Sequence, residues 1–472
     1  MTLQIPPRLI LKVAPKHAWE GALTLSPEAA PEEPNPLKPG KKVGDILTDS
    51  GQIGVSLGAA EKLKSANIRK AGEAAGLWLV QHQAGLVSLP VSAFESLPEG
   101  ALEDFCEGLL LGAFQFDLYK AGDAPVNPVE VWVLTEAGDT VTQTKIRRVN
   151  ATVNGVNLAR EWSHEPPNVI NPVSLAARAR DLAAATGLKC TVFGEAELTE
   201  MGAGAILAVG LGSKTPSQMI ILEHNGADAS AAPVVVVGKA ITFDTGGYSL
   251  KNTQGMLGMK FDKCGGMAVL GIMQAAAALN LPTRVIGIVA AAENMVSSEA
   301  YRPNDIITSL SGKTIEIVST DAEGRMVLSD ALTYASRELG PRAILDLATL
   351  TGGVVVALGK VRAGIMSNDE HLAAALSEVG ESCGERLWRL PLDEEYFELI
   401  RGSDSDLRNS AGKPLASSIV GGLFLKQFVL NEVPWAHIDI AGVATVENGP
   451  SGGQEATGFG VRLVLGYLES LE

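Results

Sequence analysis

The chain has 472 residues, and its composition is that of a folded, acidic protein. Hydrophobic residues make up 46% and charged residues 19%, which allows a large buried core and excludes disorder as the main state. The formal net charge of −16 argues against a protein that coats nucleic acid or binds an anionic membrane, because either needs a basic face. The sequence has no CxxC pair, no secretory signal and no apolar run of roughly 18 residues. We therefore expect a cytoplasmic protein without a membrane or nucleic-acid partner.

The first third of the chain predicts a small α/β domain. Residues 26–43 are rich in proline and charge, which is typical of an exposed loop. The apolar patterns predict helices and strands; the helices are expected over 58–74 and 99–120, and the strands over 77–81 and 129–136. The second helix has acids near its start and Lys120 at its end, a polarity that the helix dipole favours.

A long helix is expected over 142–163, and the two prolines of the following HEPPN segment end it. We place the domain boundary in this helix. The predicted organisation is an N-terminal α/β domain over 1–150 with an oligomerisation or regulatory role, a linking helix and proline-rich junction over 151–167, and a catalytic domain over 168–472. A helix over 172–187, with its glycine cap, opens the second domain.

Apolar runs and helices then alternate along the chain. The runs expected as strands are 205–210, 219–224, 234–238, 284–294, 314–319 and 343–348. The helices expected between them are 265–279 and 326–339. Near-continuous apolar strands that alternate with helices indicate a mainly parallel sheet covered on both faces. The predicted fold is thus α/β with two domains, the larger one built on such a sheet, and its ligands are expected at the carboxyl ends of the strands.

Ionisable residues gather in three segments after apolar runs. They are Lys239, Asp244 and Lys251 in 234–251, Asp262 in 259–266, and Asp321, Glu323 and Arg325 in 314–332. Carboxylates that converge at one sheet edge repel each other unless cations neutralise them, and one or more divalent ions are the simplest explanation. Oxygen-rich sites with bridging carboxylates suit a pair of such ions. Beside two dications Lys239 would lose its proton and become a nitrogen ligand. Lys251 and Arg325 would stay cationic and stabilise an oxyanion.

Simpler interpretations exist for several of these residues. Asp244 alone is typical of a turn or solvated loop. Asp321 could be the N-cap of a helix, and Glu323 in its first turn would interact favourably with the helix dipole. Cys264 beside Asp262 suggests a nucleophile, but buried cysteine is commoner. The glycine pairs 246–247 and 265–266 allow close backbone approach, and the second opens a helix. Neither HExxH nor GxxxxGK[ST] occurs, which disfavours a His-based zinc protease and a P-loop enzyme.

Read together, the motifs resemble those of the leucyl (cytosol) aminopeptidase family. Its octapeptide Asn-Thr-Asp-Ala-Glu-Gly-Arg-Leu stands here as Ser319–Met326, and the order of further segments matches as well. These segments are Lys239–Gly247, Met259–Asp262, Glu293–Met295, Tyr301–Pro303, Asp346–Gly352 and His437–Gly442. The resemblance is strong over about residues 160–470. Departures are Ser319 for Asn, Lys263 for Met and Val296 for Pro, and the first two lie beside the site, where we expect them to bear on side-chain preference.

The resemblance implies two divalent metal sites. One would use Asp244, Asp321 and Glu323, and the other Lys239, Asp244, Asp262 and Glu323. Lys251 and Arg325 match the catalytic positions, with a bicarbonate ion on Arg325 as the base. In the substrate site, Met259 matches a wall of the pocket for the first side chain, and the loop that contacts the substrate backbone contains Thr349, Leu350 and Gly352.

The resulting hypothesis is an aminopeptidase that removes N-terminal residues, leucine-like and others, from small peptides. A metal-bridging hydroxide would attack the scissile carbonyl, and the ions would be zinc or manganese, with magnesium or cobalt as alternatives. The resemblance also implies a homohexamer. Two other classes remain open from the residues alone. One is a two-metal phosphoesterase, and the other is a non-enzymatic binding protein, for which the acidic charge is unsuited to DNA.

Overall fold

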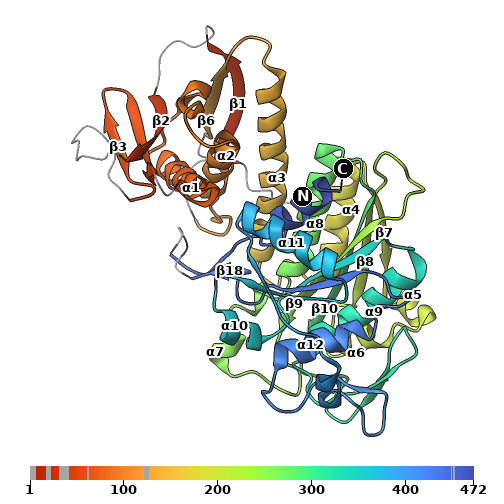
Figure 1. Ribbon diagram of the computed structural model, residues 1–472. Helices are drawn as coiled ribbons and strands as arrows, with labels where there is room; N and C mark the ends of the chain where they lie inside the picture. Colours follow the sequence, from red (N-terminus) through yellow and green to blue (C-terminus); the bar gives the residue numbers. More distant parts are fainter. Residues whose placement is uncertain are drawn as a thin grey trace. The chain divides into compact units, whose positions relative to one another are not determined.

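The computed structural model describes residues 7–16, 23–30, 42–60, 63–121, 127–447, 449 and 452–471. The chain divides into two compact units, Met1–Asn157 and Leu158–Glu472, and the division falls inside helix α3 (Thr140–His164) (Figure 1). The predicted α/β class is confirmed in both units. Within the described residues, no helix combines the length and apolarity that a bilayer crossing requires.

The N-terminal unit is built on a six-stranded sheet in the order β1-β6-β5-β2-β4-β3, parallel except for the β3–β4 pair. Its strands are β1 (Leu9–Pro15), β2 (Leu23–Ala30), β3 (Ile46–Asp49), β4 (Gln52–Ala59), β5 (Leu86–Pro90) and β6 (Val129–Thr135). The helical segments besides α3 are α1 (Ser65–Gln81), α2 (Ala101–Gly112) and the 3₁₀ turn Val91–Phe94. Helices α1 and α2 pack closely through glycines: a Cβ atom added to Gly76 would lie 2.0 Å from the Leu109 carbonyl oxygen.

Several predictions for this unit are wrong. Residues 77–81 are the end of α1 and not a strand, because the apolar face of this helix continues through Leu79 against the core. Residues 26–30 belong to β2, whereas 31–41 of the predicted loop lie outside the described residues. The helix predicted to end at Lys120 ends at Gly112, so Lys120 does not complement its dipole. The strand β6 and the helix α3 are confirmed.

The second unit is built on an eight-stranded sheet in the order β15-β14-β17-β13-β9-β10-β8-β7. Its strands are β7 (Lys189–Phe193), β8 (Gln218–His224), β9 (Val234–Asp244), β10 (Val285–Asn294), β13 (Ala343–Ala348), β14 (Ala363–Ser367), β15 (Leu387–Arg389) and β17 (Trp435–Asp439). The four central strands β17, β13, β9 and β10 are mutually parallel. Their carboxyl ends therefore share one edge of the sheet, which is where parallel sheets bind ligands.

Helices cover both faces of this sheet (Figure 1). The helices of this unit are α4 (Pro172–Thr186), α5 (Glu195–Met201), α6 (Gly204–Gly210), α7 (Thr253–Met256), α8 (Cys264–Leu279), α9 (Glu323–Glu338), α10 (Gly352–Leu358), α11 (Glu370–Cys383), α12 (Ser417–Lys426) and α13 (Val461–Glu469). The 3₁₀ turns are Met259–Phe261 and Glu394–Leu399. Helix α8 packs on β9 and β10 next to α4 and α13, while α9 packs on the same strands next to α6 and α12. The first half of the central strand β9 is accordingly apolar, with Val234–Val237 fully buried.

Two predictions for this unit need correction. Residues 205–210 form helix α6 and not the predicted strand. The prediction is wrong because a short apolar run does not distinguish a buried helix from a strand. Residues 314–316 form β12 of a separate three-stranded sheet, with the other strands β11 (Ile306–Thr308) and β16 (Leu407–Arg408). The remaining pair, β18 (Thr445–Val446) and β19 (Glu455–Ala456), forms a small hairpin. Helix α4 is confirmed, with Asn171 as its N-cap and Gly187 left-handed at its end.

Candidate metal centre

A cavity of about 390 Å³ opens at the carboxyl edge of the central strands. It is lined by all the site residues singled out in the sequence except Arg325, namely Lys239, Asp244, Lys251, Met259, Asp262, Asp321, Glu323, Thr349, Leu350 and Gly352. Only Asp244 reaches it from the end of a strand of the main sheet. Asp262 follows a 3₁₀ turn and Glu323 begins α9, so the assumption that every segment follows a strand of that sheet is wrong.

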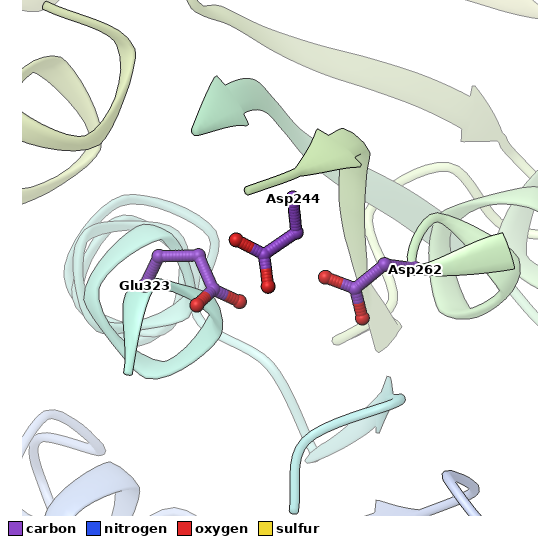
Figure 2. A group of neighbouring side chains, drawn as sticks. All are labelled: Asp244, Asp262 and Glu323. Carbon is purple, nitrogen blue, oxygen red and sulfur yellow. The ribbon is translucent and has the colours of Figure 1, made fainter. Parts of the chain in front are cut away.

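Three carboxylates form the centre of the cavity wall. One oxygen atom from each of Asp244, Asp262 and Glu323 lies within 4.8 Å of the others, and all three side chains point toward one another (Figure 2). All three residues are buried. Such a buried group of acids is unstable unless positive charge accompanies it.

Part of that positive charge is Lys239. Its Nζ atom lies 2.7 Å from Asp262 Oδ1 and 2.8 Å from Glu323 Oε1, and it donates a hydrogen bond to the carbonyl oxygen of Thr349 at 2.8 Å. Burial opposes the charge of Lys239, but the neighbouring carboxylates raise its pKa above the ordinary value. Among the protein groups alone Lys239 is thus an ammonium. Deprotonation to a nitrogen ligand would require further positive charge in the cavity.

The acids retain unused capacity to bind a cation. Burial and the neighbouring Glu323 raise the pKa of Asp262 to about 8 even though Lys239 opposes the shift. The second oxygens of Asp262 and Glu323, Oδ2 and Oε2, are buried and have no hydrogen-bond partner among the described residues. Buried acceptors are rarely left in this state, and hard divalent cations prefer oxygen ligands of this kind. The residues present therefore fit a divalent metal ion.

Lys251 joins Asp244 to Asp321. Its Nζ atom lies 2.8 Å from Asp244 Oδ2 and also contacts the Asp321 carboxylate. Burial opposes its charge, but Asp244 and its acidic neighbours raise the pKa of Lys251 above the ordinary value. Burial also raises the pKa of Asp321 to about 6. The helix-cap interpretation of Asp321 is wrong, because Ala322 occupies the N-cap of α9 and no side chain caps it.

Arg325 lies behind the cavity wall on α9 and is buried. Its Nη1 atom donates to the carbonyl oxygen of Asn409 at 2.7 Å, while its Nε atom has no partner in the described part of the chain. Burial lowers the pKa of Arg325 to about 10, which still leaves the guanidinium charged at neutral pH. Arg325 therefore offers a buried cationic donor close to the acids.

The substrate-side residues come from two loops. Thr349, after β13, donates its hydroxyl to Asp262 Oδ1 at 2.7 Å. The cavity is also lined by residues that were not predicted individually from the sequence, namely Val355, Ala441, Ala444, Thr445 and Gln454. Ala441 was predictable as a site residue, because it follows strand β17, and the carboxyl ends of β17 and its parallel neighbour β13 lie at the same edge of the sheet.

Three of the other candidates do not reach the cavity. Ser319 and Lys263 are not among its lining residues. Lys263 is fully buried and donates to the main-chain carbonyl oxygens of Ser163, Glu165 and Lys260. Burial raises the pKa of the Cys264 thiol to about 11, which disfavours a nucleophilic thiolate.

Fold and centre together define a class: an α/β protein whose carboxylates and lysines form a site that fits divalent metal at the edge of a parallel sheet. The model of the cytosol aminopeptidase family, catalytic domain, matches residues 157–465. The probable cytosol aminopeptidase of Geobacter sulfurreducens is 43% identical over 420 residues, which cover 88% of this chain and 84% of that protein. That of Roseiflexus castenholzii is 46% identical over 380 residues, which cover 79% and 77%.

A solved structure is similar to almost the whole chain. The bottromycin maturation enzyme BotP in complex with Mn superposes with a TM-score of 0.87 at 31% identity and covers 95% of this chain and 99% of that one. The chain belongs to the cytosol aminopeptidase family and is a metal-dependent aminopeptidase. This membership decides between the two hydrolase classes that the carboxylates alone left open, in favour of peptide and against phosphate-ester hydrolysis.

Proposed function

We propose that the cavity is a two-metal centre that releases N-terminal amino acids from small peptides. The observation that carries the proposal is the buried trio Asp244, Asp262 and Glu323, whose oxygens lie within 4.8 Å of one another. Two of these residues keep a buried oxygen without a partner among the described residues. The two ammonium groups of Lys239 and Lys251 do not balance the four carboxylates of the trio and Asp321.

The ligand sets follow the residues that face the cavity. One ion would be held by Asp244, Asp321 and Glu323, and the other by Lys239, Asp244, Asp262 and Glu323. Divalent ions there supply Lewis-acid polarisation of the scissile carbonyl and activation of water. Manganese is supported by the complex of BotP with Mn, and zinc is compatible with the same donors.

The chain's own residues complete the chemistry. Lys251, next to Asp244, would donate to the oxyanion that develops on the scissile carbonyl. Arg325, with its unpaired Nε, would hold a bicarbonate ion that relays the proton. Met259 would contact the first side chain of the substrate, and Thr349, Leu350 and Gly352 its backbone.

Metal depletion and add-back tests the proposal. We expect the chelated protein to lose turnover of a panel of aminoacyl p-nitroanilides, leucyl included, and to regain it with Mn²⁺ or Zn²⁺. Two equivalents of ion per chain should be needed for full recovery. Recovery complete at one equivalent, or absent with every divalent ion, would contradict the two-metal centre.

A further inference from the structure

Asn294 is a buried amide beside the carboxylates, and the proposed chemistry does not use it. It ends β10 and is completely buried. Its Nδ2 atom donates to Asp244 Oδ1 at 2.8 Å and to the carbonyl oxygen of Thr320 at 3.0 Å. One side chain therefore contacts two of the three segments that bring carboxylates to the cavity.

The orientation of this amide follows from its partners. A carboxylate and a carbonyl group are both acceptors, so only the NH₂ end of the Asn294 side chain can face them. The opposite atom, Oδ1, has no partner among the described residues and lies against Gly247, where an added Cβ atom would come within 3.0 Å of it. Asn294 thus leaves its own acceptor unpaired while it makes two donor bonds, which indicates that the donor bonds determine its orientation.

The two acceptors lie at informative positions. Asp244 is one of the two carboxylates assigned to both metal ions, and Thr320 directly precedes Asp321. Thr320 is bound elsewhere too: its Oγ1 donates to the carbonyl oxygen of Gly246 at 2.6 Å, and Tyr301 donates its hydroxyl to the carbonyl oxygen of Thr320 at 2.8 Å. Among the described side-chain amides and hydroxyls around the cavity, only that of Asn294 donates a hydrogen bond to Asp244.

We propose that Asn294 is a positioning residue of the metal centre, an inference that rests on the proposed two-metal function. Its amide holds the Asp244 carboxylate at a set rotation and ties it to the segment of Asp321 and Glu323. The carboxylates then meet the ions without reorganising. Removal of a residue that hydrogen-bonds to a metal ligand typically weakens metal binding by about 10- to 100-fold.

The test is a calorimetric titration of chelated protein with Mn²⁺ for the wild type, Asn294→Leu and Asn294→Ala. Leucine has nearly the shape of asparagine without its amide, and alanine removes the amide together with the side-chain volume. Tyr301→Phe is the matched control, because it removes a donor to the same Thr320 carbonyl and leaves Asp244 untouched. Circular dichroism of each metal-free protein reports folding independently of metal.

We expect both Asn294 variants to fold and to bind Mn²⁺ at least about tenfold more weakly than the wild type, with Tyr301→Phe within about twofold. Equal affinity in the Asn294 variants, equal weakening by Tyr301→Phe, or failure of both Asn294 variants to fold would overturn the inference. A wild type that binds no Mn²⁺ or Zn²⁺ would instead overturn the proposed function, so the two failures are distinguishable.

Discussion

At the scale of single residues, Lys251 is a partly buried cation with two acidic contacts. Its ammonium is held between Asp244 and Asp321, so it is positioned before any substrate arrives. A preorganised cation is worth more to a developing oxyanion than a mobile one, because it needs no reorganisation during the reaction.

We predict that Lys251→Ala lowers kcat for leucyl-p-nitroanilide by about 100-fold or more, since loss of one oxyanion donor typically costs about 3 kcal/mol. Steady-state kinetics at saturating metal measure the effect. Turnover close to the wild-type level would show that Lys251 has no catalytic role. The metal content of the variant, measured in parallel, separates a catalytic loss from a loss of metal.

A second prediction at this scale concerns His164 and pH. Burial lowers the pKa of His164 to about 4, below the ordinary value of 6.5. The unfolded chain therefore takes up a proton on this residue before the folded chain does, and its contribution to stability is lost as pH falls from 6.5 towards 4. When the pH is lowered from 7 to 5, we expect protonation of His164 in the unfolded chain to reduce the free energy of unfolding by about 2 kcal/mol.

Urea denaturation of the wild type and of His164→Gln at both pH values measures that contribution. Glutamine does not titrate, so the variant should lose less stability on acidification than the wild type by about the same 2 kcal/mol. Equal losses in the two proteins would mean that His164 is not the group responsible.

At the scale of elements, Asp330 connects α9 to the start of α6. Its Oδ2 atom accepts from the backbone N–H groups of Ala205 and Ile206 at 2.9 Å each, and its Oδ1 atom accepts from that of Leu310 at 2.8 Å. The carboxylate is fully buried. It satisfies orphan donors at a helix start that has no cap of its own.

We predict that Asp330→Ala destabilises the protein by about 3 kcal/mol, because it leaves buried N–H groups without acceptors. Asp330→Asn, which retains one acceptor oxygen, should be less destabilised. Urea denaturation at pH 7 measures both variants. An alanine variant as stable as the wild type would refute this role, and the order of the two variants checks the hydrogen-bond explanation.

Elements also explain where sequence patterns failed. Residues 77–81 and 205–210 are short apolar runs that form helix, because in a buried environment helix and strand can be equally apolar. The strands β9 and β10 were predictable because β-branched Val and Ile dominate their apolar runs, and helix α4 was predictable because capping residues mark its ends.

At the scale of the whole molecule, the family resemblance predicts a homohexamer. Multi-angle light scattering of the purified chain should then give about six times the 49.3 kDa mass of one chain. A monomer at micromolar concentration would contradict the prediction. The suggested oligomerisation or regulatory role of residues 1–150 remains a prediction of the same kind, and deletion of that segment followed by the same measurement tests it.

The sequence by itself determined the α/β class, the family and the short list of ionisable residues, because these depend on local pattern and on motifs in a set order. The tertiary structure alone decided that Asp244, Asp262 and Glu323 meet within 4.8 Å, that Lys239 lies between two of them, and that Asn294 donates to Asp244. These residues lie tens of positions apart on a strand, a turn and a helix. Their meeting depends on how the parallel strands and the helices pack, and no local pattern encodes those distances.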